Sequence, residues 1–201
     1  TTINKKVDLD FKVTYTREDV KNRPALSDHR ANPAKNLMSL ATTYDQKWLR
    51  DNYKDADGNY YDWNGRDVWN LNPYWVLNEM TNESGKDKFM GSALVRYNVN
   101  EHLKIQVTGG ADINFMNFQD YAAPSSPGFE QGQLQISDFR NRMYNIEALA
   151  IYNNSYKKFD YGVTIGGNIY KVDNKTQIVT AKEMVMRDVV ALQSFTSKEI
   201  T

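Results

Sequence analysis

Four oxygen-bearing side chains stand close together in the segment "DADGNYYD" at residues 55–62; they are Asp55, Asp57, Asn59 and Asp62. Carboxylate and amide oxygens at this spacing are the ligands that Ca²⁺ prefers. The twelve-residue EF-hand pattern is not met, because Gly58 comes too early and no Glu closes the loop. Asp-Gly is also a common turn signal. We therefore expect a turn here and leave calcium binding open as the alternative.

Six large aromatic side chains crowd the segment "YYDWNGRDVWNLNPYW" at residues 60–75; they are Tyr60, Tyr61, Trp63, Trp69, Tyr74 and Trp75. Flat rings of this kind can stack on sugar rings or pack against peptide side chains. Trp and Tyr are also enriched at protein interfaces, and long loops often fold around an aromatic cluster of their own. These six residues are the candidate substrate-binding or partner-binding residues, with internal packing as the competing interpretation.

Nothing in the sequence points to catalysis. The chain has no cysteine, which leaves no disulfide and no thiolate metal site. Its two histidines, His29 and His102, lie far apart, and no Ser-His-Asp or Cys-His set can be assigned. We therefore expect that the protein is not an enzyme and that it has no cofactor and no catalytic or metal-binding residues. The formal net charge of zero implies no general attraction to nucleic acid.

The elements that must position these residues are β-strands. The segment "LKIQVTGGADINF" at residues 103–115 alternates between apolar or small residues and polar ones from end to end. Similar alternation, with some irregular positions, occurs in four more segments, at residues 7–15, 89–99, 144–152 and 159–169. Each spans about ten residues, which is the length a tilted strand needs to cross a bilayer.

The links between these predicted strands alternate between short and long. The second and third strands are joined by "NEH" and the fourth and fifth by "NNSYKK", whereas residues 17–88, 116–143 and 171–201 form the other links. Ordinary globular domains rarely need a link of about seventy residues between neighbouring strands. Outer-membrane barrels have tight turns on the periplasmic side and long loops outside. No apolar run is long enough for a transmembrane helix.

These patterns predict an all-β fold, an antiparallel transmembrane β-barrel of which residues 1–201 contribute about five strands. Residues 17–88 and 116–143 would be extracellular loops, and residues 171–201 would begin a third. The chain opens directly on a strand and shows no signal peptide, so we expect a piece of a longer protein. The alternative is a soluble carbohydrate-binding β-sandwich, whose apolar faces would pack on each other.

The barrel interpretation assigns a side to each strand residue. Residues expected to face lipid are Val7, Leu9, Phe11, Val13, Ile105, Val107, Ile113, Val163 and Ile165. Residues expected to face a wet lumen, where they need no buried partner, are Lys12, Lys104, Asp112, Thr164 and Asn168. All four tryptophans fall in residues 17–88, so we expect this link to carry the external contacts of the chain.

Longer stretches of the sequence resemble a known family. They are "VKNRPALSD" at 20–28, "YKDADGNYYDW" at 53–63, "NLNPYWVLNE" at 70–79 and "GGNIYKVDNKTQ" at 166–177. Their order is similar to that in the barrel region of the SusC/RagA family of TonB-dependent outer-membrane transporters. The resemblance implies a 22-stranded barrel with an N-terminal plug, in the outer membrane of a Gram-negative bacterium. It also implies import of oligosaccharides or peptides powered through the TonB complex, with a SusD-like surface lipoprotein as a lid.

Overall fold

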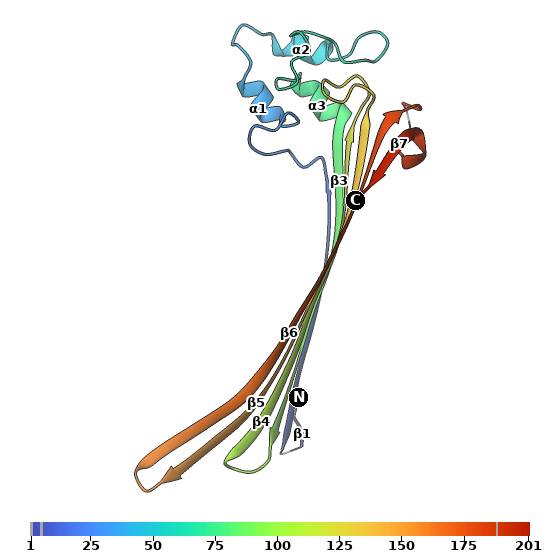
Figure 1. Cartoon of the computed structure of the whole chain (residues 1–201). Helices are drawn as coiled ribbons and strands as arrows, with labels where there is room; N and C mark the ends of the chain where they lie inside the picture. Colours follow the sequence, from blue (N-terminus) through green and yellow to red (C-terminus); the bar gives the residue numbers. More distant parts are fainter. Residues whose placement is uncertain (1, 5, 188) are drawn as a thin grey trace. The chain divides into compact units, whose positions relative to one another are not determined.

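The computed structural model describes residues 2–4, 6–187 and 189–201. Seven strands form one sheet in which neighbours follow chain order, with β1 and β7 outermost (Figure 1). The strands are β1 (Thr2–Asn4), β2 (Val7–Lys21), β3 (Met80–Asn98), β4 (Leu103–Ala122), β5 (Gln133–Tyr156), β6 (Phe159–Met184) and β7 (Phe195–Ile200). The predicted all-β antiparallel fold is thereby confirmed.

The five predicted strands correspond to β2–β6, and each is longer than its alternating segment. The link expected at 17–88 is reduced to 22–79, and the link expected at 116–143 is reduced to 123–132. Residues 171–201 do not simply begin a loop, because β6 continues to Met184 and β7 pairs back on it, with Val179 opposite Ile200. Only the end of β6 has this neighbour. The extensions escaped prediction because they carry polar residues on both faces, so no alternation marks them.

Three short helices lie in the long link: α1 (Pro33–Met38), α2 (Gln46–Asp51) and α3 (Pro73–Glu79). Each begins at a capping side chain, from Asn32, Asp45 or Asn72, that accepts a backbone N–H of the first turn. Proline follows the cap in α1 and α3, where its missing N–H costs nothing. A 3₁₀ turn, η1 (Leu192–Ser194), precedes β7. Among the described residues, no helix has both the length and the apolar character to cross a membrane.

The chain divides into two compact units. Unit 1 comprises residues 1–18, 86–116 and 139–176, which are mostly strand, and unit 2 comprises residues 19–85, 117–138 and 177–201. Unit 2 contains the buried hydrophobic cluster, made of Tyr60, Trp75, Tyr121, Ala123, Leu134, Ala181 and Phe195.

Unit 1 has one apolar and one polar face. We call apolar the face that carries the odd-numbered residues of β2, β3, β4 and β6 and the even-numbered residues of β5. Its side chains are well exposed, as shown by Phe11 at 74% and Ile165 at 71%. On the polar face, Lys88 Nζ lies 3.0 Å from Asp112 Oδ2, and Asn168 Nδ2 donates to Asn145 Oδ1 at 2.6 Å. Asp112 therefore has a cationic partner that the sequence did not predict.

A glycine explains an apolar residue on the polar face. A Cβ added to Gly166 of β6 would collide with the side chain of Leu149 of β5 and lie 2.8 Å from the carbonyl oxygen of Ala148. Gly166 therefore leaves the space into which Leu149 packs across the two strands.

Candidate functional site

The six aromatic residues differ in burial: two are buried, two are exposed, and Trp63 and Tyr74 are half-buried. Tyr60 and Trp75 are buried, at 3% and 0% exposure, with ring centroids 5.3 Å apart and planes at 85°. This edge-to-face arrangement is favourable for aromatic pairs. The Trp75 Nε1–H donates to Ser126 Oγ at 2.9 Å, which satisfies the indole inside the core. These two rings pack inside unit 2.

The Tyr60 hydroxyl has two hydrogen-bond partners within the long link. It accepts hydrogen bonds from Trp63 Nε1 at 2.8 Å and from the backbone N–H of Asn72 at 3.1 Å. Asn72 also caps α3, and its Nδ2 donates to the carbonyl of Leu49 at 2.9 Å. Burial raises the pKa of the Tyr60 hydroxyl, so it stays neutral. These hydrogen bonds hold the buried aromatic residues together, and they form a frame for the residues at the edge of the cluster.

Tyr61 and Trp69 point outward, with exposures of 38% and 56%. Tyr61 meets Trp48 edge-on at 5.7 Å between ring centroids. The guanidinium carbon of Arg30 lies 5.3 Å from the Trp69 ring centroid, within cation–π range. Lys35 Nζ donates to the Trp69 carbonyl, so the backbone of this residue is also held. Tyr74 is half-buried. Tyr61 and Trp69 are the two large rings of this set that a ligand or partner could reach directly.

The segment at 55–62 forms the turn that its Asp-Gly pair predicts. Asp55 Oδ1 accepts the backbone N–H groups of Asn59 at 2.8 Å and Asp57 at 3.0 Å. The hydrogen bond from the Asn59 backbone, foremost, holds the pKa of Asp55 below its usual range. The guanidinium of Arg187 donates to the Asp57 carbonyl at 3.1 Å and to Asn59 Oδ1 at 2.5 Å.

The calcium alternative finds little support in this geometry. Asp62 Oδ1 accepts the backbone N–H of Arg66 at 2.8 Å, so this carboxylate is turned to a different segment. Within the described residues, no three His, Cys, Asp or Glu side chains come together as metal ligands would. The side-chain oxygen of Asn59 that a cation would need already accepts from Arg187, which also donates to the backbone carbonyl of Asp57.

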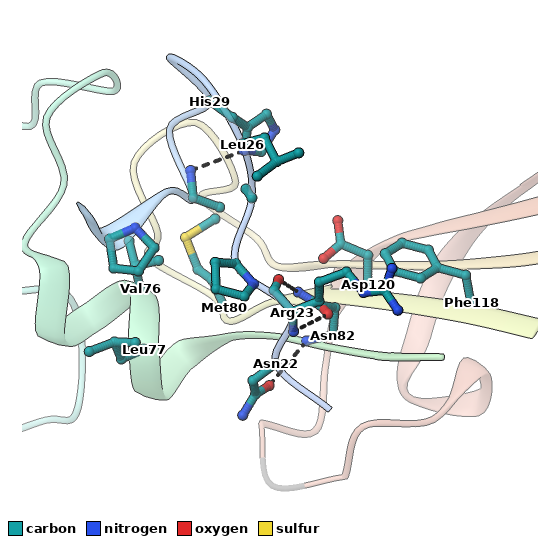
Figure 2. Close-up of a pocket in the computed structure, with 14 residues that line it drawn as sticks. Asn22, Arg23, Leu26, His29, Val76, Leu77, Met80, Asn82, Phe118 and Asp120 are labelled. Atoms are coloured by element: carbon teal, nitrogen blue, oxygen red, sulfur yellow. Dashed lines mark hydrogen bonds between the residues drawn. The ribbon is translucent and has the colours of Figure 1, made fainter. Parts of the chain in front are cut away.

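A pocket of about 460 Å³ lies in unit 2 beside α3, and the sequence did not predict it (Figure 2). Its apolar lining includes Leu26, Val76, Leu77, Met80 and Phe118, and its polar groups include His29, Asn82 and Asp120. The first residues of the link after β2 form one wall, because the Asn82 side chain accepts from the Arg23 N–H and donates to the Arg23 carbonyl, both at 2.9 Å.

Asp120 is the carboxylate among the residues that line this pocket. Asp120 is an exposed residue, yet partial desolvation by its neighbours raises the pKa of its carboxyl. The charge of the nearby His29 acts in the opposite direction and lowers this pKa. His29 is oriented by the backbone N–H of Ala31, which its Nδ1 accepts at 3.1 Å. The lining residues come from separate segments, so no local sequence pattern could have grouped them.

Comparison with known proteins shows the fold alone. No family model matches the sequence, and no curated protein matches it. The structure is similar to a chain in the solved structure of the RagAB peptide transporter, with a TM-score of 0.68 and 13% sequence identity. The similarity covers 99% of this chain and 23% of that chain. The sheet and its links therefore have the same fold as about a quarter of that longer chain.

Proposed function

We propose that this chain is part of the barrel of a SusC/RagA-type TonB-dependent transporter in a bacterial outer membrane. The observation that carries the proposal is the apolar face of unit 1, which is bounded by aromatic residues at both ends. In the proposed transporter, this face contacts lipid and the polar face lines the lumen. The cargo is an oligosaccharide or a peptide, and a SusD-like lipoprotein and the TonB complex are partners of the whole protein.

Aromatic rings mark the end of the apolar face away from the short turns. The rings of Tyr15 on β2 and Phe89 on β3 lie 4.7 Å apart. Phe115 on β4 and Tyr144 on β5 end the apolar runs of the next two strands. Outer-membrane barrels place aromatic residues at the level where lipid tails meet the headgroups.

A second set of rings marks the end near the short turns. Tyr152 on β5 lies 6.3 Å from Tyr161 on β6 and 6.2 Å from His102, measured between ring centroids. On β5 the two sets are represented by Tyr144 and Tyr152, eight residues apart. At about 3.3 Å per residue this separation is about 26 Å along the strand. A tilt of about 40° reduces it to about 20 Å across the bilayer, which is somewhat less than an apolar band about 25 Å tall.

The polar face supports the lumen assignment. It carries charged pairs between neighbouring strands, including Arg96 with Asp10 at 3.2 Å and Lys88 with Asp112 at 3.0 Å. Charges are strongly disfavoured in lipid and are well solvated beside water. A two-sheet sandwich would bury the apolar face against a second sheet, whereas the described strands all belong to one sheet.

The transport role assigns unit 2 to the extracellular side. Tyr61 and Trp69 are the exposed aromatic residues that would meet cargo or the lid protein, on the frame built by Tyr60, Trp63 and Trp75. Tyr74, which is half-buried, lies at the edge of this frame. The solved structure that this chain is similar to is that of a peptide transporter, and peptides and oligosaccharides both remain within the proposal.

Single-cysteine labelling tests the proposal, because residues 1–201 contain no cysteine of their own. In the intact protein in its membrane, Phe11→Cys and Val163→Cys should resist a water-soluble maleimide and react with a lipid-soluble one. The matched neighbours Lys12→Cys and Thr164→Cys should show the reverse. Equal labelling of both pairs by the water-soluble reagent, in a protein that needs no detergent, would favour the soluble sandwich instead.

A further inference from the structure

A group of positive side chains lies on the apolar face of unit 1, just beyond the residues at which the apolar run ends. On β5 the run ends at Tyr144, and the next side chains on this face are Arg142 and Arg140. On β6 the run ends at Ile169, and the next side chain on this face is Lys171. We call Arg140, Arg142 and Lys171 the basic cluster.

Contacts join the two arginines to the neighbouring strands, and Lys171 is placed by its position on β6. Arg140 Nη2 lies 3.8 Å from Asp173 Oδ2, which joins β5 to β6 two residues beyond Lys171. The guanidinium carbon of Arg142 lies 5.9 Å from the ring centroid of Phe115, the last aromatic residue of the apolar run on β4. Arg142 is thereby held at the level of the aromatic ring, with its charge directed to the edge of the apolar band.

The basic cluster has more positive charge than its surroundings neutralise. Asp173 is the one carboxylate that forms an ion pair with it among the described residues, and that contact is long. The Nε atoms of Arg140 and Arg142 are covered and have no hydrogen-bond partner in the described structure. Removing donors from water without an acceptor costs free energy. An external group cannot reach these covered atoms, but the net positive charge that Asp173 leaves favours binding of an external anion, to which the exposed Lys171 is accessible.

The position of the cluster identifies the anion. The apolar band of a membrane barrel ends where the headgroups begin, so these side chains lie at headgroup level on the side away from the short turns. Guanidinium groups bind phosphate through two parallel hydrogen bonds, and lysine adds a compact point charge. The lipid that covers the apolar face brings its own headgroup to this place.

We propose that the basic cluster binds the phosphate groups of anionic lipids in the outer leaflet. The inference rests on the proposed membrane location. It adds a specific lipid contact that membrane insertion alone does not require, because apolar and aromatic residues suffice to cross a neutral bilayer.

The test measures retained lipid. The intact protein is reconstituted into nanodiscs of neutral phosphatidylcholine containing a small fraction of lipid A, either phosphorylated or enzymatically dephosphorylated. The protein is then extracted in mild detergent, and the lipid A that remains bound is quantified by mass spectrometry. The variant Arg142→Gln/Lys171→Gln is compared with Lys12→Gln/Lys104→Gln, which removes the same charge from the polar face. The heat-dependent shift in gel mobility reports that each variant is folded.

We expect the wild type to retain phosphorylated lipid A and to release the dephosphorylated form. R142Q/K171Q should retain at least about tenfold less, since each cation near an anionic surface contributes a factor of about five, and K12Q/K104Q should match the wild type. Equal retention by all three proteins, an equal loss in both variants, or complete displacement by inorganic phosphate would overturn the lipid site while leaving the transporter proposal intact. A protein that enters no bilayer, even a neutral one, would overturn both.

Discussion

Trp75 in α3 donates its indole N–H to Ser126 Oγ at 2.9 Å, and Ser126 in turn donates to the Ala123 carbonyl at 2.6 Å. Both side chains are fully buried. This short chain of hydrogen bonds ties the link between β2 and β3 to the link between β4 and β5, and it makes the two links one folded body.

Loss of the Ser126 hydroxyl should loosen that body. Ser126→Ala leaves a buried indole donor without an acceptor, which should cost about 1–3 kcal/mol of the free energy of unfolding. The measurement is a thermal or chemical melt of the intact protein followed by tryptophan fluorescence. Ser39→Ala is the control, since its hydroxyl is exposed and bonds only within α1, and a change of less than about 0.5 kcal/mol is expected. Equal stability of the two variants would show that the hydrogen bond is dispensable.

Arginine on the two faces of β4 should have unequal effects. Val107→Arg places a charge on the apolar face. It should make folding into a bilayer less favourable by about 2–4 kcal/mol if the site lies near the midplane. Thr108→Arg places the same charge on the polar face and should have a mild effect. The measurement is reversible folding of the intact protein into lipid vesicles. Similar losses for both variants would contradict the assignment of the faces.

The exposed rings of the aromatic link should affect uptake without affecting folding. Tyr61→Ala/Trp69→Ala should reduce cargo uptake or lid association and leave the melt unchanged. Met38→Ala is the control, because Met38 is an exposed apolar residue of the same link, at 86% exposure. Trp75 is unsuitable for this test, since truncating a buried tryptophan should cost about 3–5 kcal/mol. Unchanged uptake and lid association in the double variant would leave these rings without a binding role.

The turn at Asp55 should open in acid. Its carboxyl has a pKa below the usual range in the folded chain, so the folded state binds that proton less readily than the unfolded state. The stabilisation is therefore present above about pH 4 and is lost as pH falls through the lower, folded pKa. Hydrogen exchange of the Asn59 amide should show protection at pH 5 that declines in more acidic solution. In Asp55→Asn this decline should disappear; a decline that persists would assign the effect to another group.

The strands of unit 1 and their two faces could be predicted from sequence, because alternation is a local signal that each of β2–β6 carries by itself. β1, β7 and the strand extensions could not be predicted, since they are short or carry polar residues on both faces, so no sustained alternation marks them. No local sequence pattern distinguishes Tyr60 and Trp75, which are buried, from Tyr61 and Trp69, which are exposed. The burial of Tyr60 and Trp75 depends on Ser126, Leu134 and Phe195, which come from links and strands far along the chain.

The incomplete partnership of β6 bears on how the protein is assembled. β7 pairs only with the end of β6, from Val179 to Met184, with one further reciprocal pair of hydrogen bonds between Ile178 and Thr201. From Phe159 to Gln177, one edge of β6 presents its backbone N–H and C=O groups with no neighbouring strand among the described residues. Such an edge in lipid costs several kcal/mol for each unpaired group. In the proposed transporter, the next strand has to reach this edge before or during insertion, so β6 acts as a template that sets the order in which the barrel grows. Made without that strand, the same edge would recruit another copy of the chain.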